Sequence, residues 1–223
     1  SWTIETQKKR ITFERKRAAE FGIDHYCAIS INPKEANNKK FADESLLVIE
    51  NYLQRESVIA LGEIGFDEIS QQEEEIFIKQ LLIGDKLQIP IIIHTPHINK
   101  LEGTKKTFEI IEKTGVDQSR IIVDHNTEET IELSLSYDVH SGITVYPNTK
   151  LSPFRAVNIM KKYGTDKILI NSSADWGVSD PLSVPKTALE MSSNGFSQKE
   201  IHKVLFLNPN NFFKQSKNYR SLE

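Results

Sequence analysis

The 223-residue sequence has one cysteine, no long apolar run and almost no net charge. A single cysteine, Cys27, cannot form an intramolecular disulfide, which excludes the disulfide-rich secreted scaffolds. No apolar run approaches the roughly 18 residues that span a bilayer, so we expect no membrane association and a cytoplasmic protein. A net charge of -3 excludes nucleic-acid binding through a bulk positive field, although it leaves room for a local basic pocket.

The N-terminal segment lacks the apolar core of a signal peptide, which takes about 7–15 consecutive residues. Its basic residues suggest a solvated helix face with Ile11, Phe13 and Phe21 turned inward. A localisation signal or a phosphate-binding patch is the alternative. The sequence also begins without methionine, so we expect that upstream residues are missing.

Six short runs rich in isoleucine and valine alternate with amphipathic stretches. The runs have the length of buried strands and do not alternate with polar residues, which is typical of parallel strands covered on both faces. These runs are Asp24–Ile31, Ser57–Ile64, Ile89–His94, Arg120–His125, Val139–Val145 and Lys167–Asn171. The predicted helices are Ala42–Arg55, Gln71–Gln88, Thr104–Thr114 and Pro153–Tyr163, and we expect Gly115, Gly164 and Gly195 to end helices.

This alternation predicts a single α/β domain over residues 1–223. Six units fit either a doubly wound sheet or part of an eight-stranded barrel, but no glycine-rich phosphate loop follows a strand to support the first. Because eight units take about 250 residues, we expect a partial TIM (β/α)8 barrel whose first two strands are missing. Two exposed sheet edges would leave an open, C-shaped sheet, which we expect to self-associate, bind metal weakly and be close to inactive.

Acidic and imidazole side chains end four of these runs. Glu63 follows VIALG, His94 follows IPIII, His125 follows IIVD and Asp175 follows ILINSSA. In a parallel barrel these positions meet at the C-terminal rim, where active sites of that architecture lie. Each residue alone has a structural explanation, as a hydrogen-bonded core histidine or a helix-capping acid. Together they predict a metal site, and two imidazoles with two carboxylates suit Zn²⁺, Mn²⁺ or Fe²⁺ better than Ca²⁺.

Four segments resemble the TatD-like metal-dependent hydrolases, a branch of the amidohydrolase-like barrels. They are GEIGFDE at Gly62–Glu68, PIIIHTPH at Pro90–His97, VDHNTEE at Val123–Glu129 and SSADWGVSDPL at Ser172–Leu182. The resemblance extends over almost the whole chain. It implies that Glu63, His94, His125 and Asp175 hold one or two divalent ions, zinc, manganese, magnesium or iron. It also implies hydrolysis of a small-molecule or nucleic-acid phosphoester, as in the deoxyribonucleases of the family, with Asp175 as general base.

The sequence departs from that family in two places. The family opens with an HxH pair that binds metal, whereas the first histidine here is His25, alone within DHY. NSSADWG also stands in place of the ETDAP usual in the nucleases, which leaves the substrate open. The alternative is therefore a non-catalytic or small-molecule biosynthetic accessory protein on the same barrel.

Further polar and aromatic residues follow the same strands. The candidate substrate-binding residues are Thr95, His97, Lys100, Asn126, Tyr146 and Trp176, with Lys150 and Asp180 beside them. Thr95, His97 and Lys100 either bind a phosphate or carboxylate group of the substrate or belong to an ordinary solvent-exposed loop. Asn126 orients His125 or touches the substrate. Tyr146 and Lys150 follow the fifth run, where a lid over the substrate would lie. Trp176 and Asp180 either form a wall of the pocket or have a purely structural role. We expect Cys27 to be a buried, inert thiol.

Overall fold

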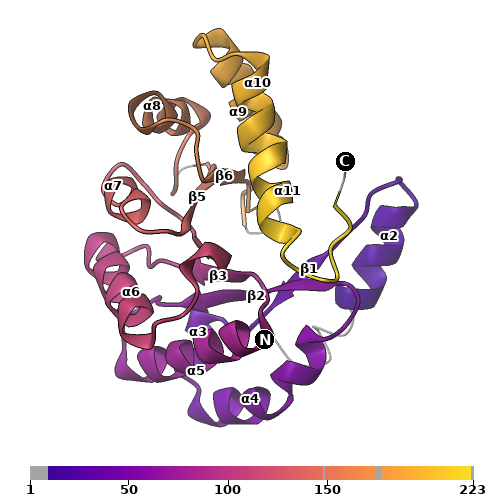
Figure 1. Cartoon of the computed structure of the whole chain (residues 1–223), viewed down its shortest axis with the longest axis vertical. Helices are drawn as coiled ribbons and strands as arrows, with labels where there is room; N and C mark the ends of the chain where they lie inside the picture. The colour runs from indigo at the N-terminus through magenta and orange to yellow at the C-terminus, as the bar shows by residue number, and fades with distance from the viewer. Residues whose placement is uncertain (1–9, 148, 174–176, 222–223) are drawn as a thin grey trace.

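The computed structural model describes residues 10–147, 149–173 and 177–221. Six parallel strands form one sheet in the order β1–β2–β3–β4–β5–β6, with the helices that connect them outside it (Figure 1). The strands are β1 (Cys27–Ile29), β2 (Val58–Gly65), β3 (Ile91–His94), β4 (Ile121–Val123), β5 (His140–Thr144) and β6 (Ile168–Asn171). Each lies within one residue of a predicted run, so the α/β prediction is confirmed.

The sheet is an open partial barrel. Each strand pairs in parallel with the next one along the chain, from the pairing of Cys27 with Val58 at one edge to that of Thr144 with Asn171 at the other. In the part of the chain that the structure describes, β1 and β6 are the two edges of the sheet. Because all strands run the same way, their carboxyl ends share one rim. The expectation of a partial TIM barrel is confirmed.

Helices connect the strands on the outer side. They are α3 (Pro33–Ala36), α4 (Lys39–Leu53), α5 (Gln71–Leu87), α6 (Lys100–Thr114), α7 (Ile131–Leu135), α8 (Pro153–Tyr163) and α9 (Ser183–Ser193), with the 3-10 turn η2 (Gln118–Arg120) before β4. The chain continues through α10 (Gln198–His202), the π-helical η3 (Lys203–Leu207) and α11 (Asn208–Phe213). The four predicted helices are present. Gly115 ends α6 in the left-handed conformation and Gly164 ends α8, whereas α9 is capped by Asn194, one residue before Gly195.

Local capping explains where the longest connecting helix starts. Ser70 precedes α5, and its hydroxyl accepts a hydrogen bond from the backbone of Glu73 while the Glu73 carboxylate accepts one from the backbone of Ser70. This reciprocal arrangement satisfies two amide groups that the first helical turn leaves without partners. The sequence SQQE therefore marks the helix start.

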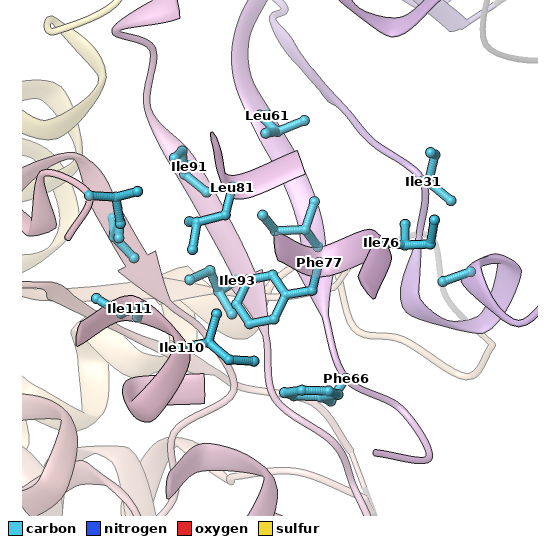
Figure 2. Packing of buried hydrophobic residues seen from close by; sticks show 14 of the residues in the cluster. Ile31, Leu61, Phe66, Ile76, Phe77, Leu81, Ile91, Ile93, Ile110 and Ile111 are labelled. Atoms are coloured by element: carbon cyan, nitrogen blue, oxygen red, sulfur yellow. The ribbon is translucent and has the colours of Figure 1, made fainter. Parts of the chain in front are cut away.

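The main apolar core lies between β1–β4 and helices α3–α6. Leu61, Ile91 and Ile93 from the strands meet Phe77 and Leu81 of α5 (Figure 2). A second buried cluster joins β5 and β6 to α8 and α9. On the inner face of the sheet, Ile122 and Leu169 are covered by Phe212 of α11. The sheet is therefore packed along its outer face and, at β4 and β6, on its inner face as well, which fits the continuous apolar strands.

The last described residues return to the amino ends of β1 and β2. The Asn218 amide donates to the carbonyl oxygens of Arg55 and Val58, both at 2.9 Å. The Tyr219 ring packs on Tyr26 at 5.1 Å, and the Arg220 amide donates to the Tyr26 hydroxyl. These contacts tie the C-terminal segment across the bottom of the sheet, opposite the rim where the strands end.

The segment before β1 does not turn its aromatic residues inward. It forms the π-helical η1 (Arg10–Glu14) and the five-residue α2 (Arg15–Ala19), but Phe13 is 58% exposed and Phe21 is 80% exposed. The expectation that they are buried is wrong, since both rings lie mainly in solvent and the main contacts of α2 are with the adjoining η1. The Ile11 side chain lies outside the described residues. No described helix has the length and apolar character needed to cross a bilayer.

Cys27 is half-buried at the start of β1. Its thiol donates to the Ser57 carbonyl oxygen at 3.4 Å. Burial raises the pKa of the Cys27 thiol, against smaller opposing effects of Ser57 and Arg15. A raised pKa disfavours the nucleophilic thiolate, which agrees with an inert thiol, but Cys27 is half-buried at the edge strand and not fully buried as expected.

Truncating Leu81 should lower the free energy of unfolding by about 2–5 kcal/mol, because the side chain is fully buried between α5 and the sheet. The same substitution at Leu47 of α4, which is 83% exposed, should change it by less than about 0.5 kcal/mol. Urea denaturation of the two alanine variants measures both. Equal losses would contradict the position of the core.

Candidate metal centre

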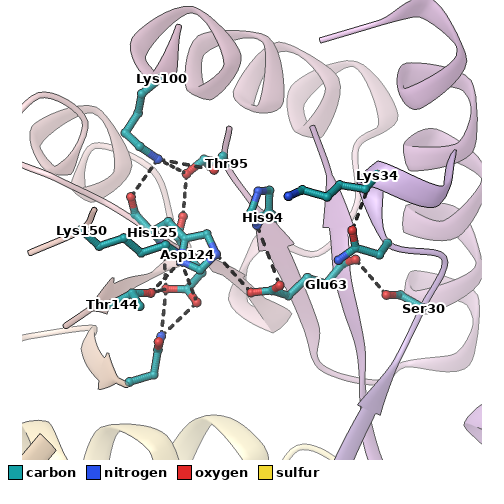
Figure 3. Close-up of polar contacts among 12 residues, drawn as sticks. Ser30, Lys34, Glu63, His94, Thr95, Lys100, Asp124, His125, Thr144 and Lys150 are labelled. Atoms are coloured by element: carbon teal, nitrogen blue, oxygen red, sulfur yellow. Dashed lines mark hydrogen bonds and ion pairs between the residues drawn. The ribbon is translucent and has the colours of Figure 1, made fainter. Parts of the chain in front are cut away.

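Three side chains from neighbouring strand ends meet at the carboxyl rim of the sheet. Glu63 lies near the end of β2, His94 ends β3, and His125 follows β4 by two residues. One ligand atom of each lies within 4.8 Å of the other two. His125 Nε2 is 3.2 Å from Glu63 Oε1, and His94 Nδ1 is 3.8 Å from Glu63 Oε2 (Figure 3). The two imidazole rings meet edge to face at 4.6 Å.

The glycines around Glu63 allow β2 to approach β3 closely. A Cβ atom on Gly62 would lie 2.6 Å from Ile92 Cβ, and one on Gly65 would collide with the His94 carbonyl oxygen. Gly65 also has a φ of +126°, which side chains rarely tolerate. The GEIG sequence therefore brings the Glu63 carboxylate beside the His94 ring.

The surroundings keep Glu63 charged and His94 neutral. Burial opposes the charge on Glu63, but the hydrogen bond to His125 and the charges of His125, His94 and Lys150 lower the pKa of Glu63 to about 2. Burial, together with the nearby His125, lowers the pKa of His94 well below its ordinary value. A carboxylate and a neutral imidazole are the protonation states in which these side chains bind metal.

One further observation supports the binding of a divalent cation by the trio of Glu63, His94 and His125. The buried His94 Nδ1 has no hydrogen-bond partner among the described residues, and it lies on the side of the ring that faces Glu63. A buried polar nitrogen without a partner is costly unless an ion or water satisfies it. Two imidazoles and a carboxylate suit Zn²⁺, Mn²⁺ or Fe²⁺, whereas Mg²⁺ prefers oxygen ligands.

A cavity of about 330 Å³ opens beside the trio. His94 and His125 form one wall, and the cations Lys100, Lys150 and Arg155 line it together with Glu128 and Glu129. On the other side of the trio, Lys34 of α3 points toward His94 (Figure 3). Cationic side chains next to a candidate metal site favour an anionic ligand.

The sequence profile of the TatD related DNase family matches residues 2–214. The chain belongs to this family. A curated relative, an uncharacterized metal-dependent hydrolase of Methanocaldococcus jannaschii, is 28% identical over 204 residues, which cover 92% of this chain and 80% of the relative.

Two solved structures of TatD-like proteins share the fold. The TatD-like protein of Archaeoglobus fulgidus aligns with a TM-score of 0.75 at 25% identity and covers 95% of this chain and 81% of its own. A TatD homologue of Escherichia coli aligns with a TM-score of 0.63 at 17% identity over 91% and 82% of the two chains. This TatD-like chain therefore has the amidohydrolase-like fold of metal-dependent hydrolases.

Thr95 and Lys100, two of the predicted substrate-binding residues of the TatD-like chain, form hydrogen bonds with protein groups in the structure. The buried Thr95 donates its hydroxyl to the Asp124 carbonyl oxygen at 2.7 Å. Lys100 Nζ donates to Thr95 Oγ1 and to the His125 carbonyl oxygen, both at 3.1 Å. Lys100 thus links the strand ends that carry His94 and His125, and both residues still line the cavity.

The other predicted residues divide by position. Asn126 is buried: its amide nitrogen donates to the Val123 carbonyl oxygen at 2.7 Å and its amide oxygen accepts from Thr130, so it is part of the turn after β4, and it also lines the cavity. His97 is exposed on the cavity wall, and Tyr146 is buried next to Gly177. Asp180 pairs with Lys186 and accepts from the Leu182 amide at the start of α9. Asp175 and Trp176 lie outside the described residues.

Sequence reasoning missed three residues that surround His125. Asp124 precedes it in the chain, Thr144 ends β5 and Asn171 ends β6. His125 Nδ1 lies 2.6 Å from Thr144 Oγ1, and the Asn171 amide donates to both oxygens of Asp124. Lys150, considered only as a lid residue, has its Nζ 2.8 Å from His125 Nδ1. The available signal was their position, since each polar residue ends or follows a buried strand.

Lys100 should titrate near pH 8, because burial and the charge of Lys150 lower its pKa to about 8 against the opposing effects of Asp124 and Glu129. The unfolded chain keeps the ordinary value near 10.5, so it binds more protons between these two pH values. The free energy of unfolding should therefore rise as pH increases from about 8 to about 10.5. Denaturant titrations with a chelator present should show a flatter profile for Lys100→Met than for wild type. The exposed Lys105→Met is the control, and a profile unchanged in Lys100→Met would contradict the assignment.

Proposed function

We propose that this TatD-like chain hydrolyses a phosphoester bond with one or two divalent ions held by Glu63, His94 and His125. The observation that carries the proposal is the meeting of these three ligand groups around the unpartnered His94 Nδ1. The family description of a DNase supports a phosphodiester as the bond that is cut. Zinc, manganese and iron suit the donor set better than magnesium.

Each residue has a separate role in this proposal. Glu63 contributes charge to the ion or ions, and the two neutral imidazoles complete the ligand set. Asp175 takes the proton of the attacking water as general base and adds a further ligand. A bound divalent ion supplies Lewis acidity, lowering the pKa of a water from about 15.7 toward 7.

The cavity supports an anionic substrate of limited size. Lys150 and Lys100 carry positive charge beside His125, whereas Arg155 is held by Glu128 through a bidentate pair at 2.8 and 2.6 Å. The space of about 330 Å³ suits a small molecule or a single nucleotide unit better than a duplex. A net charge of -3 likewise suits long nucleic acid poorly. A small phosphoester is therefore the second candidate substrate.

Metal titration tests the proposal. Wild type stripped with chelator should bind Zn²⁺ or Mn²⁺ by calorimetry, weakly because this sequence has no HxH pair, and should then cleave bis(p-nitrophenyl) phosphate slowly. Glu63→Gln should weaken binding at least about 100-fold, because it removes the only described carboxylate of the trio. Glu50→Gln, which breaks the exposed pair with Lys86, is the matched control. A wild-type protein that binds neither ion would overturn the proposal.

Salt dependence separates the two substrates. A nucleic-acid enzyme should bind single-stranded DNA with an affinity that falls steeply as salt rises, because phosphate contacts release counterions. An enzyme for a small phosphoester should show no such slope. Binding of a fluorescent oligonucleotide between about 50 and 200 mM salt measures the difference.

A further inference from the structure

We propose that Thr144, backed by the Asp124 carboxylate, positions His125 for metal binding by holding its proton on Nδ1. The Nε2 lone pair then faces Glu63 and His94. The inference rests on the metal site of the proposed function and adds two positioning residues to it. Thr144 and Asp124 touch neither substrate nor ion in this proposal, and they act only through the His125 ring.

Asp124 is a buried carboxylate surrounded by donors. Its side chain is 7% exposed, and Oδ1 accepts the His125 backbone amide at 2.6 Å. The Asn171 amide donates to Oδ1 at 3.0 Å and to Oδ2 at 2.9 Å, and the Thr144 hydroxyl lies 3.3 Å from Oδ1. Gly142 leaves the room for this group, because a Cβ atom there would collide with Asp124 Oδ1. The carboxylate is therefore fixed and acts as an acceptor toward Thr144.

The single proton of Thr144 decides the state of the imidazole. A hydroxyl has one hydrogen to donate, and an ionised carboxylate can only accept. When Thr144 donates to Asp124, its oxygen accepts from His125 Nδ1–H across 2.6 Å. The opposite arrangement, with Thr144 donating to Nδ1, would set its oxygen lone pairs against Asp124 Oδ1.

One more contact favours the proton on Nδ1, and two contacts oppose it. Asp124 Oδ2 lies 3.6 Å from Nδ1, so its negative charge favours a hydrogen on that nitrogen. Lys150 Nζ lies 2.8 Å from Nδ1 and 3.0 Å from Nε2, and because an ammonium can only donate, its shorter contact opposes a hydrogen on Nδ1. Glu63 Oε1, 3.2 Å from Nε2, pulls in the same direction as Lys150, because it would accept a hydrogen placed on Nε2. Thr144 and Asp124 oppose that pull.

The decisive measurement is the tautomer of His125 in metal-free protein. Long-range ¹H–¹⁵N correlation at about pH 9, above the ordinary histidine pKa of about 6.5, distinguishes the two neutral forms. Wild type and Thr144→Ser should show the proton on Nδ1, because both keep the hydroxyl. Thr144→Val keeps the shape without the hydroxyl and should shift the ring toward the form with the proton on Nε2. An unchanged tautomer in Thr144→Val would overturn the inference.

Zn²⁺ affinity by calorimetry gives the second readout. Thr144→Val should bind Zn²⁺ about 10–100-fold more weakly than wild type, and Thr144→Ser should stay within about threefold. Thr107→Val is the matched control, since the Thr107 hydroxyl is buried and donates within α6 to Gly103. If Thr144→Val does not fold, Asp124→Asn should show the same direction of both effects, and wild-type behaviour of that variant would overturn the inference.

The two proposals fail in different ways. Wild type that binds no Zn²⁺ removes the proposed function, while the tautomer of His125 still tests the role of Thr144. If Thr144→Val binds Zn²⁺ as tightly as wild type does, the metal site remains and the role of Thr144 is overturned.

Discussion

Replacing Glu73 by alanine should lower the free energy of unfolding by about 4 kcal/mol. Glu73 is fully buried at the start of α5, yet it carries a carboxylate. Its oxygens accept hydrogen bonds from the backbone amides of residues 67–70 and from the Asn37 side chain, at 2.8–3.3 Å. Alanine would leave these donors without partners, and each buried donor left unsatisfied costs about 1–3 kcal/mol. Water reaching part of the loop keeps the total below their sum.

Urea denaturation measures this loss, and the next residue provides the control. Glu74 has a partly exposed side chain that pairs with Lys106 at 2.7 Å, so Glu74→Ala should cost less than about 1 kcal/mol. Glu73→Gln keeps one carbonyl oxygen as an acceptor, so its loss in free energy of unfolding should lie between those of Glu73→Ala and Glu74→Ala. A Glu73→Ala variant as stable as Glu74→Ala would show that the buried carboxylate does not hold the loop after β2.

Asp175→Asn should reduce kcat on a verified phosphoester by about 10²–10⁴-fold while the melting temperature stays close to that of wild type. The change removes the proposed general base and alters one ligand but leaves the side-chain volume almost unchanged. The metal-loaded protein is compared with wild type by steady-state kinetics and thermal melting. Asp166→Asn, which breaks only the exposed pair with Lys203, is the control and should retain kcat.

Metal affinity of Asp175→Asn separates its two proposed roles. Zn²⁺ binding close to wild type together with a large loss of kcat indicates a general base, because proton transfer is lost and the ligand set is not. Weakened binding in proportion to the lost activity indicates a ligand. Wild-type kcat would show that Asp175 has neither role.

Much of the architecture could be predicted because it depends on local pattern. Buried parallel strands need continuous apolar residues, and the six runs rich in isoleucine and valine have this pattern and the length of strands. Glu63, His94 and His125 could also be predicted. Each lies at or just after the end of a predicted strand, and parallel strands place their ends at one rim. The α6 and α8 ends also followed from single glycines, because only glycine adopts those backbone conformations without strain.

The sequence by itself therefore determined the strands, the α/β class and the residues able to bind metal, because each depends on neighbours in the chain. Only the tertiary structure decided how other polar groups are used. Thr144 and Asn171 reach Asp124 across 20 and 47 residues, and no spacing in the sequence reports which of them meet. Tertiary packing likewise gave Lys100 protein acceptors at two strand ends and left Phe13 exposed, because burial depends on which surfaces come together and not on the residue alone.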